Sequence, residues 1–529
     1  MKPIPARKRE RVFHNLPASR LDLRLLHSTM SQDCLAARRF GIIVSLMVAG
    51  CVAGKSQIAT TTTLSSSQTP LGVSLPLTLT AVVSPAPPSG KVTFYDRTTV
   101  LATADLDASG SASLTTVALL PGAHHLRARY WGSSTSSRST SGYLLQEIWS
   151  GRSTGLVPGQ IGYFAPEPFQ FPTPSIVTAD FNGDGFMDFA VTLTYGGFAV
   201  FLGKGDGTFQ TPVFYNNPGL LIQSLVAGDI RGTGRQDLIA ASYDEAGFTL
   251  FIQRFWNNGD GTFSKGPDLP LPNSKSVLGS IQVADMNGDG RPDLIFMGFN
   301  IGFYVFLGDG DGQFQGPIAT MPALESYLPQ FAIADFNRDG KPDVAFTGSN
   351  ALSQAFVTVL PGNGDGGFQD PVEFAIPLGG VGEPLVTGDF NRDGKVDLAL
   401  SIETTSLNSP SVQTFLGNGD GTFQPPWTDP LGLSYQFLLA ADMNGDGIPD
   451  LVGTTGYPWV LFLYGVGDGT FQPLKEFAFV NPILGGSALA VGDFNGDGLM
   501  DVVAVGATRD CINRQCNPIW YFQVLLGTN

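Results

Sequence analysis

The sequence predicts an all-β protein in which a seven-bladed β-propeller follows a smaller β-sandwich. Three observations support this prediction. An acidic nine-residue stretch recurs seven times at intervals of 49 to 56 residues, which is typical of a repeat architecture. Short apolar runs of strand length flank each copy. The 529 residues include 66 glycines and 37 prolines, which favours short strands and turns over long helices.

Residues 1–50 are predicted to be an export leader. Arg38 and Arg39 precede the apolar stretch FGIIVSLMVAG, and Cys51 follows it. A basic segment, a short apolar segment and small residues are typical of a signal peptide, and eleven residues are too few to span a bilayer. Because the basic stretch before them is long, Met30 is a candidate for the true start.

The four residues VAGC that end at Cys51 resemble a bacterial lipobox. This resemblance implies cleavage before Cys51 and attachment of lipid to its thiol, so the protein is expected in the bacterial cell envelope or on its outer surface. The alternative is ordinary cleavage nearby and simple secretion. Export also exposes the chain to an oxidising environment. Cys511 and Cys516 are therefore predicted to form a local disulfide rather than half of a zinc site.

Charge and histidine content exclude several functions. The first 50 residues hold nine of the 30 basic and three of the 46 acidic residues, so the rest has a net charge of −22. Such a body repels nucleic acid and attracts cations. The four histidines are His14, His27, His124 and His125. The repeats therefore lack the histidine of a Ser-His-Asp triad or of a His-ligated zinc site.

Residues 51–69 read as a Ser/Thr-rich tether and a first strand. Alternating segments such as LPLTLTAVV and GKVTFYD then predict strands. Over residues 57–148 the chain resembles the bacterial Ig-like domains that serve as spacers in surface proteins, although WGSSTSS departs from their usual ending. The resemblance implies a spacer that holds the next domain away from the membrane. The adjacent His124 and His125 are expected on opposite strand faces.

Each later repeat predicts four short strands, as in a propeller blade. The acidic motif lies between two apolar runs, a third run and a GDG turn follow, and a segment with Phe and Pro completes the unit. The last repeat has no segment after VLLGTN. Residues 155–172 include GYFAPEPF, which aligns with GTFQTPVF of the first repeat, so they are predicted to supply the missing strand. The motifs start at Asp180, Asp229, Asp285, Asp335, Asp389, Asp442 and Asp493.

Residues 155–529 resemble the FG-GAP/VCBS repeat family, whose best-known member is the integrin α-subunit propeller. Motif, spacing and count all agree with this family. The resemblance implies a seven-bladed ring with protein partners on one face, but no ligand-contacting residue of the integrins carries over.

The motif places oxygen-bearing side chains at positions 1, 3, 5 and 9 and glycine at position 6, as in the first part of an EF-hand loop. Position 7 can add a backbone carbonyl. Calcium suits such an all-oxygen shell better than magnesium, and the absence of His and Cys argues against zinc and copper. The predicted ligands are Asp180, Asn182, Asp184, Phe186, Asp188, Asp285, Asn287, Asp289, Arg291, Asp293, Asp335, Asn337, Asp339, Lys341, Asp343, Asp389, Asn391, Asp393, Lys395, Asp397, Asp442, Asn444, Asp446, Ile448, Asp450, Asp493, Asn495, Asp497, Leu499 and Asp501.

The second motif departs from this pattern. It keeps Asp229, Gly234 and Asp237 but has Arg231 at position 3 and Thr233 at position 5. No metal is expected in this loop, and Arg231 or a water network should take its place. The predicted load is therefore about six calcium ions with a structural role.

The GDG turns are a separate feature. They are predicted to be tight turns whose following aromatic residue packs between blades, with a second metal site as the alternative. Their acids are Asp206, Asp260, Asp311, Asp365, Asp420 and Asp468.

For function, the sequence favours a monomeric, non-catalytic binding or adhesion protein with an unknown surface protein or glycan as partner. It contacts membrane only through its anchor. A lectin is the alternative, in which tryptophans stack on sugars, although the tryptophans of the repeats are expected in the core. A polysaccharide-active enzyme is a third reading, because carboxylate pairs can cleave glycosides. The repeat tryptophans are Trp256, Trp427, Trp459 and Trp520.

Overall fold

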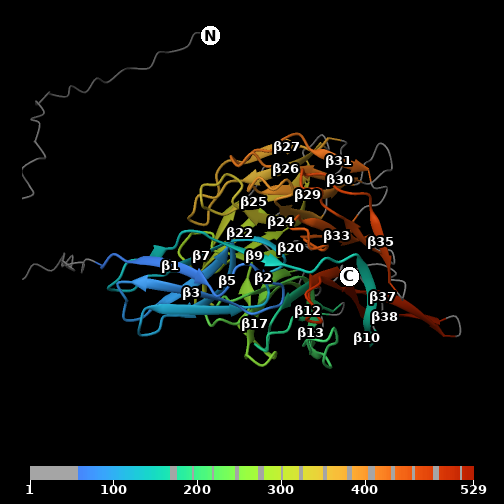
Figure 1. The fold of residues 1–529 in the computed structure, drawn as a ribbon, viewed down its shortest axis with the longest axis horizontal. Coiled ribbons are helices and arrows are strands. Elements are labelled where there is room, and N and C mark those ends of the chain that lie inside the picture. The colour runs from blue at the N-terminus through green and yellow to red at the C-terminus, as the bar shows by residue number, and fades with distance from the viewer. Residues whose placement is uncertain are drawn as a thin grey trace, which may run out of the picture. The chain divides into compact units, whose positions relative to one another are not determined.

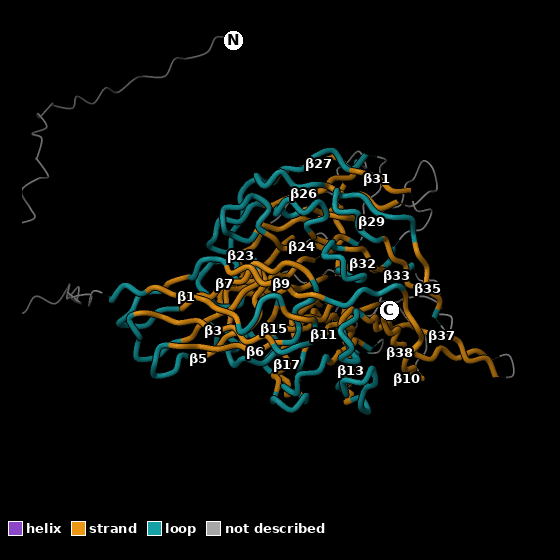
Figure 2. Tube along the Cα trace, in the orientation of Figure 1, coloured by secondary structure: helices purple, strands orange, loops and turns teal. Residues whose placement is uncertain are grey.

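A computed structural model describes residues 57–529 of the chain, apart from short internal segments. These segments are residues 167–174, 194–195, 217–219, 245–248, 272–278, 299–301, 321–325, 350–353, 378–383, 403–410, 431–434, 456–458, 480–487 and 513–514. The described residues form strands and turns without helices (Figure 2), which confirms the all-β class. Among them, no helix that could cross a membrane is found. The predicted leader, Cys51 and Met30 lie outside the described residues.

An N-terminal β-sandwich, called the sandwich below, precedes the repeats (Figure 1). Its smaller sheet has the order β1-β3-β6, and its larger sheet has the order β2-β9-β7-β4-β5 with β8 paired to β7. Side chains that alternate inward along the strands, such as Leu79, Phe94 and Leu126, are fully buried between the sheets. The strands are β1 (Thr61–Ser66), β2 (Leu71–Gly72), β3 (Leu77–Ser84), β4 (Lys91–Asp96), β5 (Thr99–Asp105), β6 (Ser111–Thr116), β7 (Gly122–Tyr130), β8 (Ser139–Thr140) and β9 (Leu144–Trp149).

Seven antiparallel sheets follow within the described residues, one for each repeat. The first six are β11 (Ile176–Ala179) to β14 (Val213–Asn216), β15 (Leu220–Gly228) to β18 (Phe263–Lys265), β20 (Gly279–Ala284) to β23 (Phe314–Thr320), β24 (Ser326–Ala334) to β27 (Val372–Ala375), β28 (Leu385–Gly388) to β31 (Trp427–Pro430), and β32 (Phe437–Ala441) to β35 (Lys475–Ala478). The short β19 (Leu269–Pro270) also pairs with β17. The predicted four strands per repeat are confirmed.

The first strands of the blades contact one another in chain order and form a closed ring. The contacts run from β11 through β15, β20, β24, β28 and β32 to β36, and β36 contacts β11. Among the described residues, the second strands are largely buried between neighbouring blades; β12 (Asp188–Thr192) is buried throughout, and β16 (Asp237–Asp244) is buried up to its last residue.

The last blade combines both ends of the propeller. Its strand order is β10-β38-β37-β36, with β10 (Gly155–Pro166), β36 (Ala488–Gly492), β37 (Asp501–Ile512) and β38 (Gln515–Thr528). Antiparallel to β38, β10 places Gly162 opposite Phe522. The prediction that an N-terminal segment completes the last blade is therefore confirmed for residues 155–166.

Aromatic residues form the seams between blades. Phe209, which follows the GDG turn of the first blade, packs against Phe494 of the seventh blade, with 5.8 Å between their ring centroids. Phe263 packs 5.4 Å from Phe181 of the preceding blade. The pairs Phe423–Phe336 and Phe471–Phe390 repeat this arrangement at 5.8 Å. These contacts confirm the prediction that the aromatic residue after each such turn packs between blades.

The sandwich and the propeller are in direct contact, and residues 56–529 form one compact unit. The linker itself is bonded to the propeller, since the Gly151 N–H donates to the Gly498 carbonyl at 2.6 Å and the Thr154 N–H donates to the Thr528 carbonyl at 2.8 Å. The role of the sandwich as a spacer between membrane and propeller stays a prediction.

Candidate functional site

The seven acidic motifs occupy equivalent loops. Each connects the first and second strands of its blade, and the acid at position 9 is the first residue of the second strand, as Asp188 is in β12. Because successive blades repeat one strand topology, all seven loops lie at the same end of their blades. The repeat architecture thus collects the acidic motifs on one face of the ring, called the loop face below.

The first loop folds around its leading carboxylate. Asp180 Oδ1 accepts hydrogen bonds from the backbone N–H groups of Gly183 at 2.7 Å and Asp184 at 3.1 Å, and Asp180 Oδ2 accepts one from Gly185 at 2.9 Å. Gly185 has φ of +87°, a conformation that favours glycine. The bond from position 6 to the carboxylate at position 1 recurs in the other five intact loops at 2.8 to 3.0 Å.

The acid at position 9 is buried beneath each loop. Asp188 is fully buried, its Oδ2 accepts the Phe181 N–H at 2.8 Å, and its Oδ1 accepts the Gly203 N–H at 2.7 Å. Burial, together with the charges of Asp180 and Asp184, raises the pKa of Asp188 to about 7. Burial likewise raises the pKa of the other position 9 acids, to about 8 for Asp293 and Asp450, about 7 for Asp501, and about 6 for Asp343 and Asp397.

These loops offer the donor set of a hard cation. Carboxylates, an asparagine amide and a backbone carbonyl supply only oxygen, and a buried carboxylate without a counter-charge is costly. Within the described residues, no three acidic, histidine or cysteine side chains converge closely enough to form a metal site by themselves. To bind a cation, a loop would therefore also have to supply its asparagine and carbonyl oxygens as ligands. The position 5 carboxylate would have to rotate toward the ion.

Three loops hold a basic side chain against the position 5 acid. Arg291 and Lys341 each place a nitrogen 3.6 Å from the carboxylate two residues before them, and Lys395 Nζ lies 2.9 Å from Asp393 Oδ2. These pairs are partly exposed, so each contributes little to stability. A metal ion bound in one of these three loops would have to displace the basic side chain from the position 5 carboxylate.

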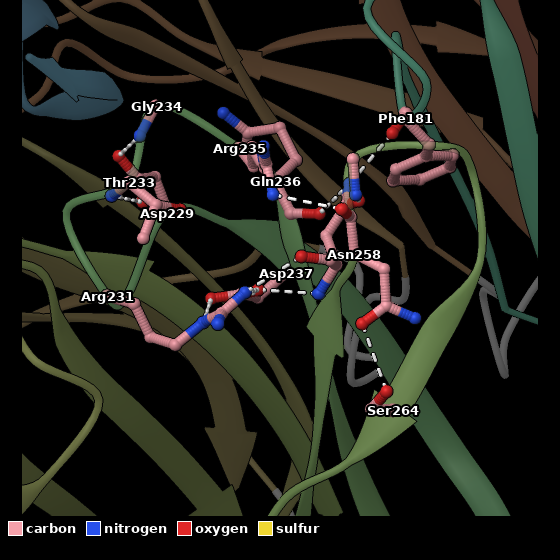
Figure 3. A network of polar contacts seen from close by, with 12 residues as sticks. Phe181, Asp229, Arg231, Thr233, Gly234, Arg235, Gln236, Asp237, Asn258 and Ser264 are labelled. Carbon is pink, nitrogen blue, oxygen red and sulfur yellow. Dashed lines mark hydrogen bonds and ion pairs between the residues drawn. The ribbon is translucent and has the colours of Figure 1, made fainter.

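The second loop is built differently (Figure 3). Arg231 forms a two-pronged ion pair with the buried Asp237, with Nε 2.9 Å from Oδ2 and Nη2 2.6 Å from Oδ1. The same Nη2 donates to the Asn257 carbonyl at 3.0 Å. The predicted placement of Arg231 among the remaining acids is confirmed. The guanidinium of Arg231 thus places a positive charge from the chain itself next to the buried Asp237.

The acidic side chain of a GDG turn accepts hydrogen bonds from within its own turn. In the first, Asp206 Oδ1 accepts from the Thr208 N–H at 3.0 Å and from Thr208 Oγ1 at 2.6 Å. These hydrogen bonds lower the pKa of Asp206, which is exposed. Asp260, Asp420 and Asp468 make the same pair of bonds to a threonine two residues on. The geometry is that of a tight turn, as predicted.

The tryptophans are not uniformly buried. Trp427 is 51% exposed and Trp459 is 38% exposed, so the prediction that they pack in the core is wrong for both. Each is the first residue of its strand, Trp427 in β31 and Trp459 in β34 (Trp459–Leu463). Trp256 is partly buried, with the guanidinium groups of Arg231 and Arg254 at 5.0 and 5.4 Å from its ring. The side chain of Trp520 lies outside the described residues.

The two predicted disulfide partners face one another in backbone register. Cys511 and Cys516 are directly opposite in the β37–β38 hairpin. Their side chains lie outside the described part of the chain, so the disulfide stays a prediction.

Contacts between the sandwich and the motif loops were not predicted from the sequence, and a buried hydrogen bond of Tyr95 is one of them. Tyr95 of the sandwich donates from Oη to Asp285 Oδ2 at 2.7 Å, and both residues are buried. No local pattern around Tyr95 distinguishes it from an ordinary strand aromatic.

Similar solved structures include the BP39L lectin from Burkholderia pseudomallei, with 16% identity, coverage of 64% of this chain and 96% of that chain, and a TM-score of 0.46. A mutant of AofleA from Arthrobotrys oligospora has 14% identity, coverage of 61% and 91%, and a TM-score of 0.40. The Dos1 propeller has 12% identity, coverage of 70% and 95%, and a TM-score of 0.40. Among curated proteins, no sequence match was found.

Two family profiles match the chain. Residues 62–147 match the bacterial Ig-like domain of group 3. The FG-GAP-like repeat matches residues 180–240, 229–296, 335–400 and 442–504. The chain is therefore a protein of FG-GAP-like repeats, folded as a seven-bladed propeller, behind a bacterial Ig-like domain.

Proposed function

We propose that this protein is an exported binding protein of the bacterial cell surface whose non-catalytic propeller is stabilised by calcium. The observation that carries the proposal is the common construction of six loops on one face. In each, an all-oxygen donor set surrounds a carboxylate that is buried at position 9, as Asp188 is. A cation would relieve both the burial of that charge and its repulsion from the acids at positions 1 and 5.

The ligands of each ion are the predicted side chains at positions 1, 3, 5 and 9 and the position 7 carbonyl. Because hydrogen bonds already order the loop, as those to Asp180 do, the protein supplies a preformed cradle. The role of the ion is structural: it fixes the connection between the first two strands of a blade.

Calcium titration by calorimetry tests this step. About six ions per chain are expected, together with a large rise in melting temperature, because calcium binds only the folded loops. Asp188→Asn should remove one ion, while Asp206→Asn, which alters an exposed turn, should remove none. A full-length protein that binds no calcium and melts unchanged in chelator would overturn the calcium proposal.

The binding role follows from what a closed ring provides. Buried second strands and aromatic seams make the seven blades a rigid platform, on which turns and loops vary without loss of the fold. The partner we propose is a surface protein or a glycan. The repeats themselves contain no histidine, because the four histidines all precede them in the sequence. We therefore propose binding without catalysis.

The exposed tryptophans favour a lectin as the second candidate. Trp427 and Trp459 present large aromatic faces on blades five and six, and such faces can stack on sugar rings. A glycan array separates the two candidates. Sugar binding that is lost in Trp427→Ala or Trp459→Ala, but kept in Trp149→Ala, would establish the lectin. Trp149 is the matched control because it is 60% exposed and lies in the sandwich. Protein hits without sugar hits would establish the adhesin.

A further inference from the structure

The outer strand of the larger sandwich sheet is covered by the propeller. In the order β2-β9-β7-β4-β5, β5 has a neighbour on one side only. The free side of an edge strand presents unpaired N–H and C=O groups. Two of these groups, the Thr103 N–H and the Leu101 carbonyl, are bonded to the second motif loop. The Thr103 N–H donates to Asp229 Oδ2 at 2.9 Å, and Gln236 Nε2 donates to the Leu101 carbonyl at 2.7 Å.

The side chains of Asp229 and Gln236 pair with the edge of β5 as a neighbouring strand would. Residues two apart in a strand point to the same side, and a strand partner would supply one acceptor and one donor there. Asp229 supplies the acceptor, and Gln236 supplies the donor. Asp229 and Thr103 are almost fully buried at this contact, where an unpaired N–H or carboxylate would be costly.

Residues in which the second loop differs from the other six lie at this contact. Arg231 pairs with Asp237, so this loop holds its own counter-charge and Asp229 need not serve a cation. At position 8, Gln236 is an amide where the other loops have Met, Pro or Val. In the first loop, the Asp180 carboxylate accepts hydrogen bonds from within the loop, whereas Asp285 of the intact third loop also accepts one from Tyr95 of the sandwich.

Further contacts extend the interface along the sandwich. Lys91 Nζ donates to the Gly232 carbonyl at 2.5 Å, on the second loop. On the third loop, Tyr95 bonds to Asp285, and the Arg291 guanidinium lies 5.3 Å from the ring of Trp131. The second loop therefore lies within a continuous surface that includes strands β4, β5 and β7.

We infer that the second motif loop is the docking site for the Ig-like domain, and that its altered residues replace a cation site by a polar cap on the edge of β5. The partner of this surface is the chain's own sandwich. The inference does not depend on calcium binding or on the ligand of the propeller.

Hydrogen exchange of the full-length protein tests the inference, with the β5 peptide (Thr99–Asp105) as the readout. Gln236→Met removes one donor and installs the residue found at position 8 of the first and last loops, so the fold should tolerate it. We expect the β5 peptide to exchange about fivefold faster in this variant. In Asp229→Asn/Gln236→Met we expect about thirtyfold faster exchange.

The matched control is Asp180→Asn, the same change at position 1 of the first loop, which should leave β5 exchange unchanged. The melting temperature of each variant confirms that the ring is folded. Unchanged β5 exchange in the folded Gln236→Met and double variants would overturn the inference. So would an equal acceleration in Asp180→Asn, because the effect would then be a general loosening of the loop face.

Discussion

Gly155 and Thr528 are backbone partners at one end of the antiparallel pair of β10 and β38. The first and last strands of the propeller thus share one sheet, and hydrogen bonds between them hold the ring closed. Within this pair, Gly162 lies opposite Phe522. A Cβ at Gly162 would lie 2.2 Å from Cε1 of the Phe522 ring, closer than atoms can approach.

Gly162→Val should therefore weaken the closure. Phe522 is buried against Phe201, at 5.0 Å between ring centroids, and against Phe189 at 5.4 Å, so it cannot move aside without cost. We expect a loss of about 2 kcal/mol in the free energy of unfolding, measured by denaturant titration. Gly142→Val is the control, because Gly142 is exposed and a Cβ there would meet no atom within 4 Å. Equal stability of the two variants would contradict the proposed strain.

Without calcium, the propeller should become less stable as the pH rises. Burial raises the pKa of Asp293 and Asp450 to about 8 and that of Asp188 to about 7. A raised pKa means that the folded state binds protons more tightly than the unfolded state. The stabilisation is therefore complete below the unfolded pKa and is lost as the pH rises through the folded pKa. In chelator, we expect the melting temperature to fall between about pH 5 and pH 8.

Saturating calcium should largely remove this dependence, because the metal takes the place of the protons. Scanning calorimetry with and without chelator measures both curves. A melting temperature in chelator that rises over this pH range would contradict the assignment of these acids as the destabilising groups.

Restoring the second motif should create a calcium site. Arg231→Asn/Thr233→Asp turns DIRGTGRQD into the pattern of the other six loops. Asp237 then loses its guanidinium partner and regains acids beside it. We expect one more calcium ion per chain than in the wild type, measured by calorimetry. Arg231→Ala, which removes the pair without adding ligands, should bind no extra ion and should lose about 3 kcal/mol of stability.

The pKa values of the adjacent His124 and His125 should be shifted in opposite directions from the usual histidine value. Burial lowers the pKa of His124, but the hydrogen bond to Asp96, the charge of Asp96 and the bond to the Leu120 carbonyl together outweigh burial and raise this pKa overall. Its Nδ1 lies 2.6 Å from Asp96 Oδ2 and its Nε2 lies 2.6 Å from the Leu120 carbonyl, so both nitrogens face acceptors. Burial lowers the pKa of His125. NMR titration of labelled histidine should show His124 deprotonating at the higher pH.

The pair of His124 and Asp96 predicts the pH range in which the sandwich is most stable, which lies between the lowered pKa of Asp96 and the raised pKa of His124. Although burial raises the pKa of Asp96, the hydrogen bond and charge of His124, the charge of Arg97 and the His125 N–H together lower this pKa overall. Its contribution is lost as the pH falls through that lowered pKa, and the His124 contribution is lost as the pH rises through its raised pKa. Asp96→Asn should abolish the raised titration of His124. A His124 that still titrates high in this variant would contradict the assignment.

Much of the architecture could be predicted from local patterns. The blade count follows from the motif starts, the four strands follow from the apolar runs, and the pairing of β10 with β38 follows from the segment missing at the end of the last repeat. From positions 3 and 5 of the second loop, the sequence predicted that Arg231 or a water network would lie among the remaining acids. The structure pairs the guanidinium with Asp237.

The interface between the sandwich and the propeller could not be predicted in this way. Its hydrogen bonds join residues far apart in the chain, such as Thr103 and Asp229, and they use backbone groups of β5 that any sequence would have. Trp427 and Trp459 were misplaced for a related reason. An aromatic residue at the start of a strand fits a seam or a surface equally well, and the neighbouring blade decides which.

The shared last blade has a consequence for the order in which the chain folds. β10 precedes every other strand of the propeller, and its partner β38 is the last to be made. During synthesis, β10 therefore has no strand partner until β38 is made, while the other six blades pair strands that are close in the chain. A chain that stops before β38 should stay sensitive to protease along its whole propeller. Closure of the ring depends on β38, because it is the strand that pairs with β10.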